Sequence, residues 1–238
     1  MYPSGMSWTK FEYLRRVLWE IDLPTVSEEM LIHLDLGAGN RPRNPFNANK
    51  LLACDVFPIS KFTAECDYIQ CDITVELPFP SNTFSSVSAY DVLEHVPRWE
   101  RRQNQVIFPF VNLMSEIYRV LKPGGYFYAV TPMFPRSSAF TDPTHVNYIT
   151  LESVNYFGGP SHSKHLGYGF EGSFKIIFAN WLRGAGPFDP TSSLANQVRN
   201  NPWSKISILA LLRLLRRFLL RVLNLKPTHG LWVLQKPK

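Results

Sequence analysis

Three aspartates each follow a short apolar run, and two glycines stand close to the first of them. In the motif LDLGAGN, Asp35 precedes Gly37 and Gly39, which let the backbone turn sharply and let a ligand approach closely. Asp55 comes 20 residues later, and a carboxylate there can accept hydrogen bonds from both hydroxyls of a ribose. Asp72 follows a third run and can accept a hydrogen bond from an exocyclic amine such as adenine N6. Each aspartate alone could be a turn or cap residue, but the three together favour a ligand site.

Histidines and a further aspartate could supply acid–base chemistry. The segment DPTH contains Asp142 and His145, and an imidazole, which titrates near neutral pH, can act as a general base toward a hydroxyl. The alternative is that Asp142 caps a turn and His145 orders a loop. His95 is the second candidate, with a structural role as its alternative. His162 and His165 could line a pocket or bind a metal, but no spacing is diagnostic, so the sequence predicts no metal site.

These residues need a sheet that brings their segments to one edge. Seven short apolar runs predict strands, and strands that alternate with helices indicate a parallel, doubly wound α/β sheet. The expected strands are 31–36, 51–56, 68–71, 84–90, 126–131, 174–181 and 231–235.

Helices are expected at four places in the chain. Apolar spacing predicts one over 6–20 and one over 111–121, the latter stopping before the sequence KPGG. A short helix over 150–157 should be capped by Thr150. A further helix of roughly 20 residues is expected between the last two strands.

Composition excludes several classes of protein. The 238 residues are 45% hydrophobic and 18% charged, which is enough apolar material for a core and rules out a wholly disordered chain. No repeat at a fixed period indicates a solenoid or propeller. The three cysteines show no CxxC spacing, and the first 20 residues have no uninterrupted apolar stretch. We therefore expect a reduced, cytoplasmic location without a signal peptide.

A dinucleotide-dependent oxidoreductase is the obvious competitor for the glycine-rich segment. Its full fingerprint needs a third glycine that opens a helix, so that a pyrophosphate can sit at the helix N-terminus. Here Pro42 stands at that position. The segment therefore favours a different nucleotide-like ligand.

Five motifs, in order, resemble class I S-adenosylmethionine-dependent methyltransferases. They are LDLGAGN, ACDVFP, CDITVELPFPSNTFSSV, YDVLEHV and RVLKPGGYFYAVTP, and the resemblance covers roughly residues 31–155. The LPFPSNTFSSV and VLEHV segments particularly resemble the small-molecule branch of these enzymes.

The resemblance implies a Rossmann-like sheet of seven strands whose last strand is antiparallel, with S-adenosylmethionine as cofactor. The sequence departs from the family pattern at three places. Asn40 stands where many members have a third glycine, Ser85 stands where an aspartate is common, and the prolines in 40–48 leave no room for a long first helix. The implied cofactor residues are Asp35, Gly37, Ala38 and Gly39 around the methionine portion, Asp55 with Val56 at the ribose and adenine, Asp72 with Ile73 at the adenine amine, and Tyr90 at the methionine end.

The C-terminal part of the chain is strongly basic. The last 49 residues hold nine Lys and Arg and no acid, while the first 189 carry 16 basic and 19 acidic residues, a net charge of −3. Within 203–225, arginines fall on one helical face and leucines largely on the other. This pattern predicts an interfacial helix on an anionic membrane, or a helix packed on its own domain or on a partner. Four arginines in this segment exclude a membrane span, and the missing aromatic interleaving argues against nucleic acid.

Together these features predict an enzyme of three parts. The parts are an N-terminal helical cap (1–30), a methyltransferase core (31–189), and a basic amphipathic helix followed by the final strand (190–238). We expect O-methylation of a small-molecule or glycan acceptor, lipid-linked if the basic helix brings the protein to the inner face of a membrane. A lipid or quinone methyltransferase is the close alternative. A non-catalytic, cofactor-binding membrane scaffold is the alternative of another class.

Overall fold

The computed structural model describes residues 31–158, 169–170, 172–182 and 227–238. The chain divides into two compact units, Val26–Leu182 with Thr228–Lys238, and Met1–Thr25 with Arg183–Pro227. All described residues except Pro227 belong to the first unit. The helices expected over 6–20 and 203–225, and His162 and His165, lie outside the described residues. Within the described ranges, no helix combines the length and hydrophobicity needed to cross a bilayer.

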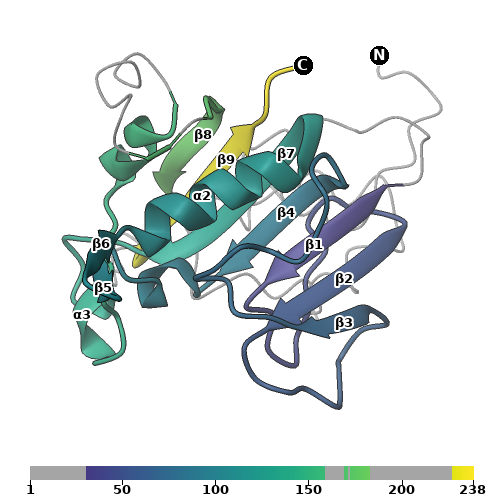
Figure 1. Ribbon diagram of the computed structural model, residues 1–238, viewed down its shortest axis with the longest axis horizontal. Helices are drawn as coiled ribbons and strands as arrows, with labels where there is room; N and C mark the ends of the chain where they lie inside the picture. Colours follow the sequence, from purple (N-terminus) through teal and green to yellow (C-terminus); the bar gives the residue numbers. More distant parts are fainter. Residues whose placement is uncertain (1–30, 159–168, 171, 183–226) are drawn as a thin grey trace, which may run out of the picture. The chain divides into compact units, whose positions relative to one another are not determined.

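The first unit is built on a seven-stranded sheet. In spatial order the strands run β3-β2-β1-β4-β7-β9-β8 (Figure 1). Their bounds are β1 Ile32–Leu36, β2 Lys50–Asp55, β3 Asp67–Gln70, β4 Phe84–Tyr90, β7 Leu121–Pro132, β8 Lys175–Trp181 and β9 His229–Gln235.

Strand directions confirm the expected Rossmann-like arrangement. Strands β3, β2, β1, β4 and β7 pair in parallel, whereas β9 runs antiparallel to both β7 and β8. The order of strands reverses between β1 and β4, because the chain moves outward to β3 and then returns to the other side of β1. In open α/β sheets, ligands bind at the carboxyl ends of the strands beside such a reversal. The sheet therefore places the ends of β1 and β4 where a ligand site is expected.

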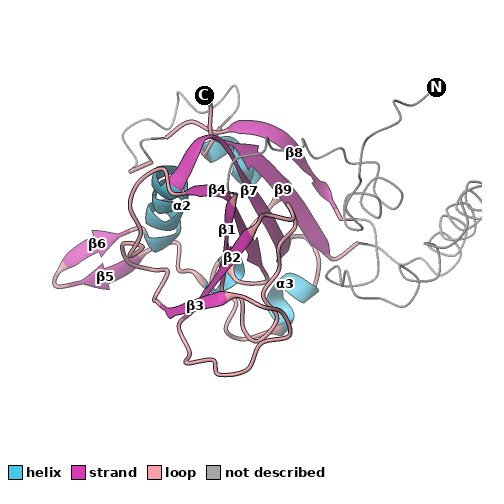
Figure 2. Ribbon diagram, turned by 90° about the vertical axis from the view of Figure 1, so that its right-hand side faces the viewer, coloured by secondary structure: helices cyan, strands magenta, loops and turns pink. Residues whose placement is uncertain are grey.

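One face of the sheet carries the hydrophobic core. Helix α2 (Pro109–Val120) packs on it with apolar side chains at helical spacing, and Figure 2 shows this helix on one side of the sheet. Proline at the first helical position suits the start of α2, because its missing N–H would have no partner there. The buried cluster joins helix and strands through Leu113, Met114, Ile117, Leu34, Val87, Phe127 and Trp232.

The opposite face carries polar groups in the middle of the sheet. His33, Ser86 and Ser88 are buried there, and the His33 ring hydrogen-bonds to the hydroxyls of both serines. Phe46 covers this face by stacking on Tyr126, with ring centroids 5.7 Å apart. It comes from segment 40–49, which forms no helix, as its prolines predicted.

The remaining elements agree with the sequence only in part, and the short helices Leu93–His95 and Ser138–Thr141 were not predicted. Thr150 and Ser153 form a reciprocal capping box at the start of the 3-10 helix η2 (Leu151–Tyr156), which confirms the expected cap. Strand β7 begins at Leu121 rather than 126, because Leu121 already pairs with Phe84 before the KPGG turn. A hairpin of β5 (Glu100–Arg102) and β6 (Gln105–Ile107), visible in Figure 2, was not predicted.

Candidate functional site

The three sequence-predicted aspartates lie at one edge of the sheet. Asp35 is the penultimate residue of β1 and Asp55 is the last residue of β2. Asp72 follows β3 by two residues. Because β1, β2 and β3 are parallel neighbours, their carboxyl ends meet at the same edge. The structure thus brings together the three carboxylates that the sequence singled out.

The turn after β1 needs its two glycines for different reasons. Gly37 has φ +61°, and a Cβ built there would lie 2.4 Å from Cγ2 of Val92. Gly39 has φ +52°, but a Cβ there would meet nothing within 4 Å. A left-handed backbone costs other residues about 1–2 kcal/mol. Gly37 therefore lets the turn pack on Val92, whereas Gly39 borders open space in which a ligand can approach the backbone.

Asp35 is fully buried and held by two hydrogen bonds. Its Oδ2 accepts from the backbone N–H of Arg43 at 2.8 Å, and its Oδ1 accepts from the Ser88 hydroxyl at 2.5 Å. Burial raises the pKa of Asp35 from 3.8 to about 7, and the Ser88 and Arg43 hydrogen bonds oppose that rise. The Asp35 carboxyl therefore titrates near neutral pH. Ala38, in the adjoining turn, is buried and donates its N–H to the carbonyl of Cys54.

A directed chain of side chains leads to Asp35 from inside the sheet. Ser88 gives its hydroxyl proton to Asp35, so it can only accept from Nε2–H of His33, 2.8 Å away. The Nδ1 of His33 then accepts from the Ser86 hydroxyl, also at 2.8 Å. Burial lowers the pKa of His33 from 6.5 to about 3, so the ring is neutral, as this chain requires.

The two buried groups affect stability with opposite signs. The folded protein holds the Asp35 proton more tightly than the unfolded chain, so that contribution favours the fold below pH 3.8 and is lost as the pH rises to about 7. His33 binds its proton less tightly when folded, so its contribution is present above pH 6.5 and is lost as the pH falls to about 3. The two pH dependences largely cancel between about pH 4 and 6.5.

The second and third carboxylates lie beside apolar surface. Asp55 accepts from Gly39 N–H at 2.9 Å and from Phe57 N–H at 3.0 Å, one bond on each oxygen. A carboxylate offers about four acceptor positions, so further donors can still bind. Val56 and Phe57, next in the chain, are 52% and 69% exposed. Asp72 accepts from the N–H of Thr74 at 2.8 Å, and the neighbouring Ile73 is buried.

Tyr90 is the last residue of β4, so it stands at the same edge of the sheet, and its side chain is buried. The guanidinium of Arg43 lies over its ring, 4.5 Å from the centroid. Since the backbone of Arg43 also holds Asp35, the 40–48 segment ties the end of β1 to the end of β4. The sequence did not single out Arg43.

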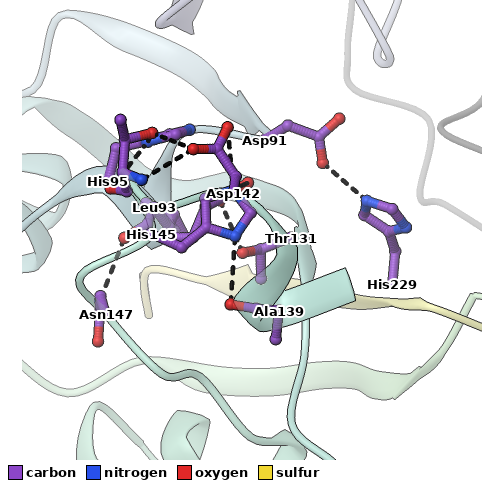
Figure 3. Close-up of polar contacts among 11 residues, drawn as sticks. Asp91, Leu93, His95, Thr131, Ala139, Asp142, His145, Asn147 and His229 are labelled. Carbon is purple, nitrogen blue, oxygen red and sulfur yellow. Dashed lines mark hydrogen bonds and ion pairs between the residues drawn. The ribbon is translucent and has the colours of Figure 1, made fainter. Parts of the chain in front are cut away.

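The predicted acid–base residues gather at the ends of β4 and β7. Figure 3 shows His95, Asp142 and His145 side by side, although 47 residues separate the first two. His95 belongs to the 3-10 helix η1 (Leu93–His95), and Asp142 and His145 follow the short helix α3 (Ser138–Thr141). Nε2 of His145 lies 3.9 Å from Oδ2 of Asp142 and 3.9 Å from Oε1 of Glu94. The rings of His95 and His145 meet edge to face, 4.9 Å apart.

Hydrogen bonds define which nitrogen of each histidine carries the proton. Nδ1 of His145 lies 3.2 Å from the carbonyl of Ala139, which can only accept. Thr144 donates its hydroxyl to Asp142 at 2.6 Å, so it can only accept from Nδ1 of His95 at 3.0 Å. Both rings therefore carry their proton on Nδ1 and keep a lone pair on Nε2 when neutral.

Glu94 is the member of this cluster that the sequence did not single out. It is only 2% exposed, and its Oε2 accepts from the Thr131 hydroxyl at 2.8 Å. Burial raises the pKa of Glu94 to about 7, which the Thr131 hydrogen bond opposes. Its position beside His95 in VLEHV was the only available signal, since Thr131 and His145 are distant in the chain.

A second pair joins the same edge from the last strand. Nε2 of His229, the first residue of β9, lies 3.1 Å from Oδ1 of Asp91 (Figure 3). Asp91 directly follows β4 and has φ +52°, a conformation that is uncommon for residues other than glycine. The sequence gave no reason to pair two residues 138 positions apart.

The seven-stranded sheet, with its order β3-β2-β1-β4-β7-β9-β8 and antiparallel β9, has the fold of class I S-adenosylmethionine-dependent methyltransferases. Residues 34–129 match the model of the family described as a methyltransferase domain. A comparison with curated protein sequences finds no match.

Solved structures resemble the chain in fold. A S-adenosylmethionine-dependent methyltransferase from Archaeoglobus fulgidus is 15% identical with a TM-score of 0.53, over 95% of this chain and 92% of that one. A chain from the complex between the Trm112 methyltransferase activator and a methyltransferase of Haloferax volcanii is 14% identical with a TM-score of 0.51. That match covers 96% of this chain and 90% of the other. At these identities the likeness concerns the fold.

Proposed function

We propose that the protein transfers a methyl group from S-adenosylmethionine to a hydroxyl of a small-molecule or glycan acceptor. The observation that carries this proposal is the cluster of Glu94, His95, Asp142 and His145 next to the glycine turn. Val92 packs against Gly37, and Glu94 follows Val92 by two residues, so the cluster adjoins the turn proposed to hold the methionine portion. A hydroxyl acceptor benefits from such proton-accepting groups, whereas an amine needs only its lone pair.

The residues at the sheet edge fit the cofactor. Open space beside Gly39 leaves room for a ligand against the backbone. Asp35 offers a carboxylate for the amino group of the methionine portion, and Asp55 offers its remaining acceptor positions for the ribose hydroxyls. Val56 exposes an apolar side chain beside Asp55 on which an adenine ring can pack. Asp72, Ile73 and Tyr90 complete the proposed cofactor set.

The methyl group of the cofactor is already activated, so the protein mainly has to align the acceptor oxygen with it. The bound cofactor supplies a methyl group on a sulfonium; the carbon–sulfur bond breaks with its electron pair left on sulfur, and a carbon–oxygen bond forms to the acceptor. The chain holds the acceptor oxygen in line and receives the hydroxyl proton, which leaves toward the cluster. We propose His145 as the residue nearest that proton, with Asp142 and His95 holding the cluster in place.

Calorimetry tests the cofactor assignment before any acceptor is known. We expect the purified protein to bind S-adenosylmethionine with micromolar affinity and not to bind NAD, because Pro42 replaces the glycine that a pyrophosphate site needs. A screen of glycan, lipid and quinone hydroxyls would follow. Binding of NAD alone would overturn the proposal in favour of an oxidoreductase. Cofactor binding without turnover of any acceptor class would favour the non-catalytic scaffold.

An exposed aromatic cluster favours a lipid or quinone as the second candidate acceptor. Phe134, Phe140 and Tyr148 are each 49% exposed, and they flank the segment that carries Asp142 and His145. Phe140 packs on Phe134 and on Tyr148 with centroid distances of 6.2 and 4.9 Å. An apolar or aromatic acceptor could stack on this surface with its hydroxyl toward the cluster.

The proposal that the acceptor is lipid-linked depends on residues 203–225, which lie outside the described part of the chain. We propose that this basic segment holds the cytoplasmic protein on the inner face of a membrane. The full chain should sediment with anionic vesicles, and less so as salt rises, because arginines attracted to headgroups are screened. Variants with Arg213, Arg216, Arg217 and Arg221 changed to Gln should lose this binding. Equal binding to neutral vesicles at every salt concentration would contradict the mechanism.

A further inference from the structure

We propose that Glu94, His95 and His145 bind a divalent transition-metal ion, with Asp142 as a fourth ligand. The inference deepens the proposed function and rests on it, because the ion would stand where the acceptor hydroxyl is activated. No sequence spacing revealed the site. The fold alone joins the two neighbours in η1 to a histidine 50 residues further along.

The separations between the ligand atoms match those around a shared ion. One ligand atom each from Glu94, His95 and His145 lies within 4.8 Å of the other two. The two separations of 3.9 Å that join His145 Nε2 to the carboxylates of Glu94 and Asp142 are too long for hydrogen bonds. Two ligands bound at about 2.1 Å in tetrahedral geometry stand about 3.4 Å apart. Closing the group around an ion would shorten the two 3.9 Å separations by about 0.5 Å and a separation of 4.8 Å by about 1.4 Å, which rotation of the side chains can supply.

The lone pairs needed for coordination are already available. Because the Nδ1 protons of His95 and His145 are donated to oxygens of Thr144 and Ala139, each Nε2 is left as a potential ligand. Metal-binding histidines usually donate their other N–H to a carbonyl or carboxylate, which fixes the ring. Glu94 is likewise held by the Thr131 hydroxyl on one oxygen, which leaves Oε1 facing His145. The outer contacts of a metal site are thus in place.

The kind of ion follows from the ligand atoms. Imidazole nitrogens suit zinc, iron, cobalt and nickel, whereas sites of oxygen atoms alone suit magnesium and calcium. Three protein ligands leave the fourth tetrahedral position open for the acceptor oxygen, whereas with Asp142 as a fourth ligand the ion would bind the acceptor by becoming five-coordinate. A divalent ion lowers the pKa of a bound hydroxyl. The bound hydroxyl would then give its proton to solvent, which reaches the site because the Asp142 side chain is 48% exposed, and the ion would keep its oxidation state. His145 would bind the ion in this arrangement instead of receiving the proton.

Cobalt titration of the chelator-treated full-length protein tests the site. We expect one Co²⁺ per chain, with visible absorption typical of nitrogen and oxygen ligands, and competition by Zn²⁺. The variants His145→Gln and Glu94→Gln should each weaken binding by more than about 100-fold, the upper loss seen for outer-shell partners. A His162→Gln/His165→Gln variant is the matched control and should bind Co²⁺ normally. Circular dichroism checks that each variant is folded.

The same samples separate failure of this inference from failure of the proposed function. Each is also titrated with S-adenosylmethionine. Normal cofactor binding without any bound Co²⁺ would overturn the metal site and leave methyl transfer standing. Co²⁺ binding that is unchanged in His145→Gln and Glu94→Gln, or lost in the His162/His165 control, would also overturn it. Loss of S-adenosylmethionine binding in the folded wild type would instead overturn the proposed function.

Discussion

The variant His145→Gln should bind S-adenosylmethionine as the wild type does and lose turnover by at least about 100-fold, the lower range for a proton-transfer group. Nε2 of His145 lies 3.9 Å from the carboxylates of Glu94 and Asp142, and Gln keeps much of the size of His but cannot accept a proton at neutral pH. The side chain belongs to the cluster of Glu94, His95, Asp142 and His145, which we propose receives the acceptor proton, and not to the predicted cofactor residues. Calorimetry with the cofactor, together with kcat for an acceptor found by screening, measures the two effects separately.

Val146→Ala is the matched control for this variant. Val146 is the next residue and is about half exposed, so its truncation should change neither cofactor binding nor kcat. Normal turnover by His145→Gln would show that His145 only orders the loop after α3. Loss of cofactor binding in the same variant would place His145 in the cofactor site instead.

The variant Asp35→Asn should lose most of its affinity for S-adenosylmethionine. In the wild type the affinity should fall as the pH drops below about 7, by up to tenfold per unit, because Asp35 is then protonated and must give up its proton to pair with a cation. Above that pH the carboxyl is already ionised, so this effect ends. Calorimetric titrations between pH 5.5 and 8.5, roughly spanning the Asp35 pKa, should show the slope in the wild type and not in Asp35→Asn.

The variant Ser88→Ala provides a second test, the midpoint of the pH dependence of cofactor affinity. This midpoint would not change if Asp35 had only a structural role. The Ser88 hydrogen bond opposes the rise in the pKa of Asp35, so its removal should raise that pKa further. The midpoint of the pH dependence should then shift upward, while the affinity at high pH changes little. A midpoint that stays fixed in Ser88→Ala, or a slope that persists in Asp35→Asn, would assign the pH dependence to another group, such as the cofactor's own amine.

Features formed by neighbouring residues could be predicted from the sequence. The motif LDLGAGN specified strand, carboxylate and turn together, because glycines at positive φ must follow the buried strand for the chain to turn there. The cap at Thr150 could also be predicted because it is a local feature: its partner Ser153 is only three residues away. The parallel sheet was expected from the alternation of strands with helices, and its seven strands with an antiparallel last strand were expected from the resemblance of consecutive motifs.

Features that depend on distant pairs could not be predicted. Glu94 meets His145, and Asp91 meets His229, only because β4, β7 and β9 are neighbours in the sheet. His33 sits within an apolar run, and nothing local indicates that Ser86 and Ser88 on the adjacent strand will satisfy its ring. The β5–β6 hairpin turns at Gln103 and Asn104, both at positive φ, where glycine is the usual signal.

The position of β9 has a consequence for how the protein is made. During synthesis β7 and β8 emerge long before β9, which later fills the gap between them and brings His229 to Asp91. Until then, two strands present unpaired N–H and C=O groups to the surroundings, and such edges are templates for association with other chains. The seven-stranded sheet can therefore be completed only after residues 229–235 have been synthesised.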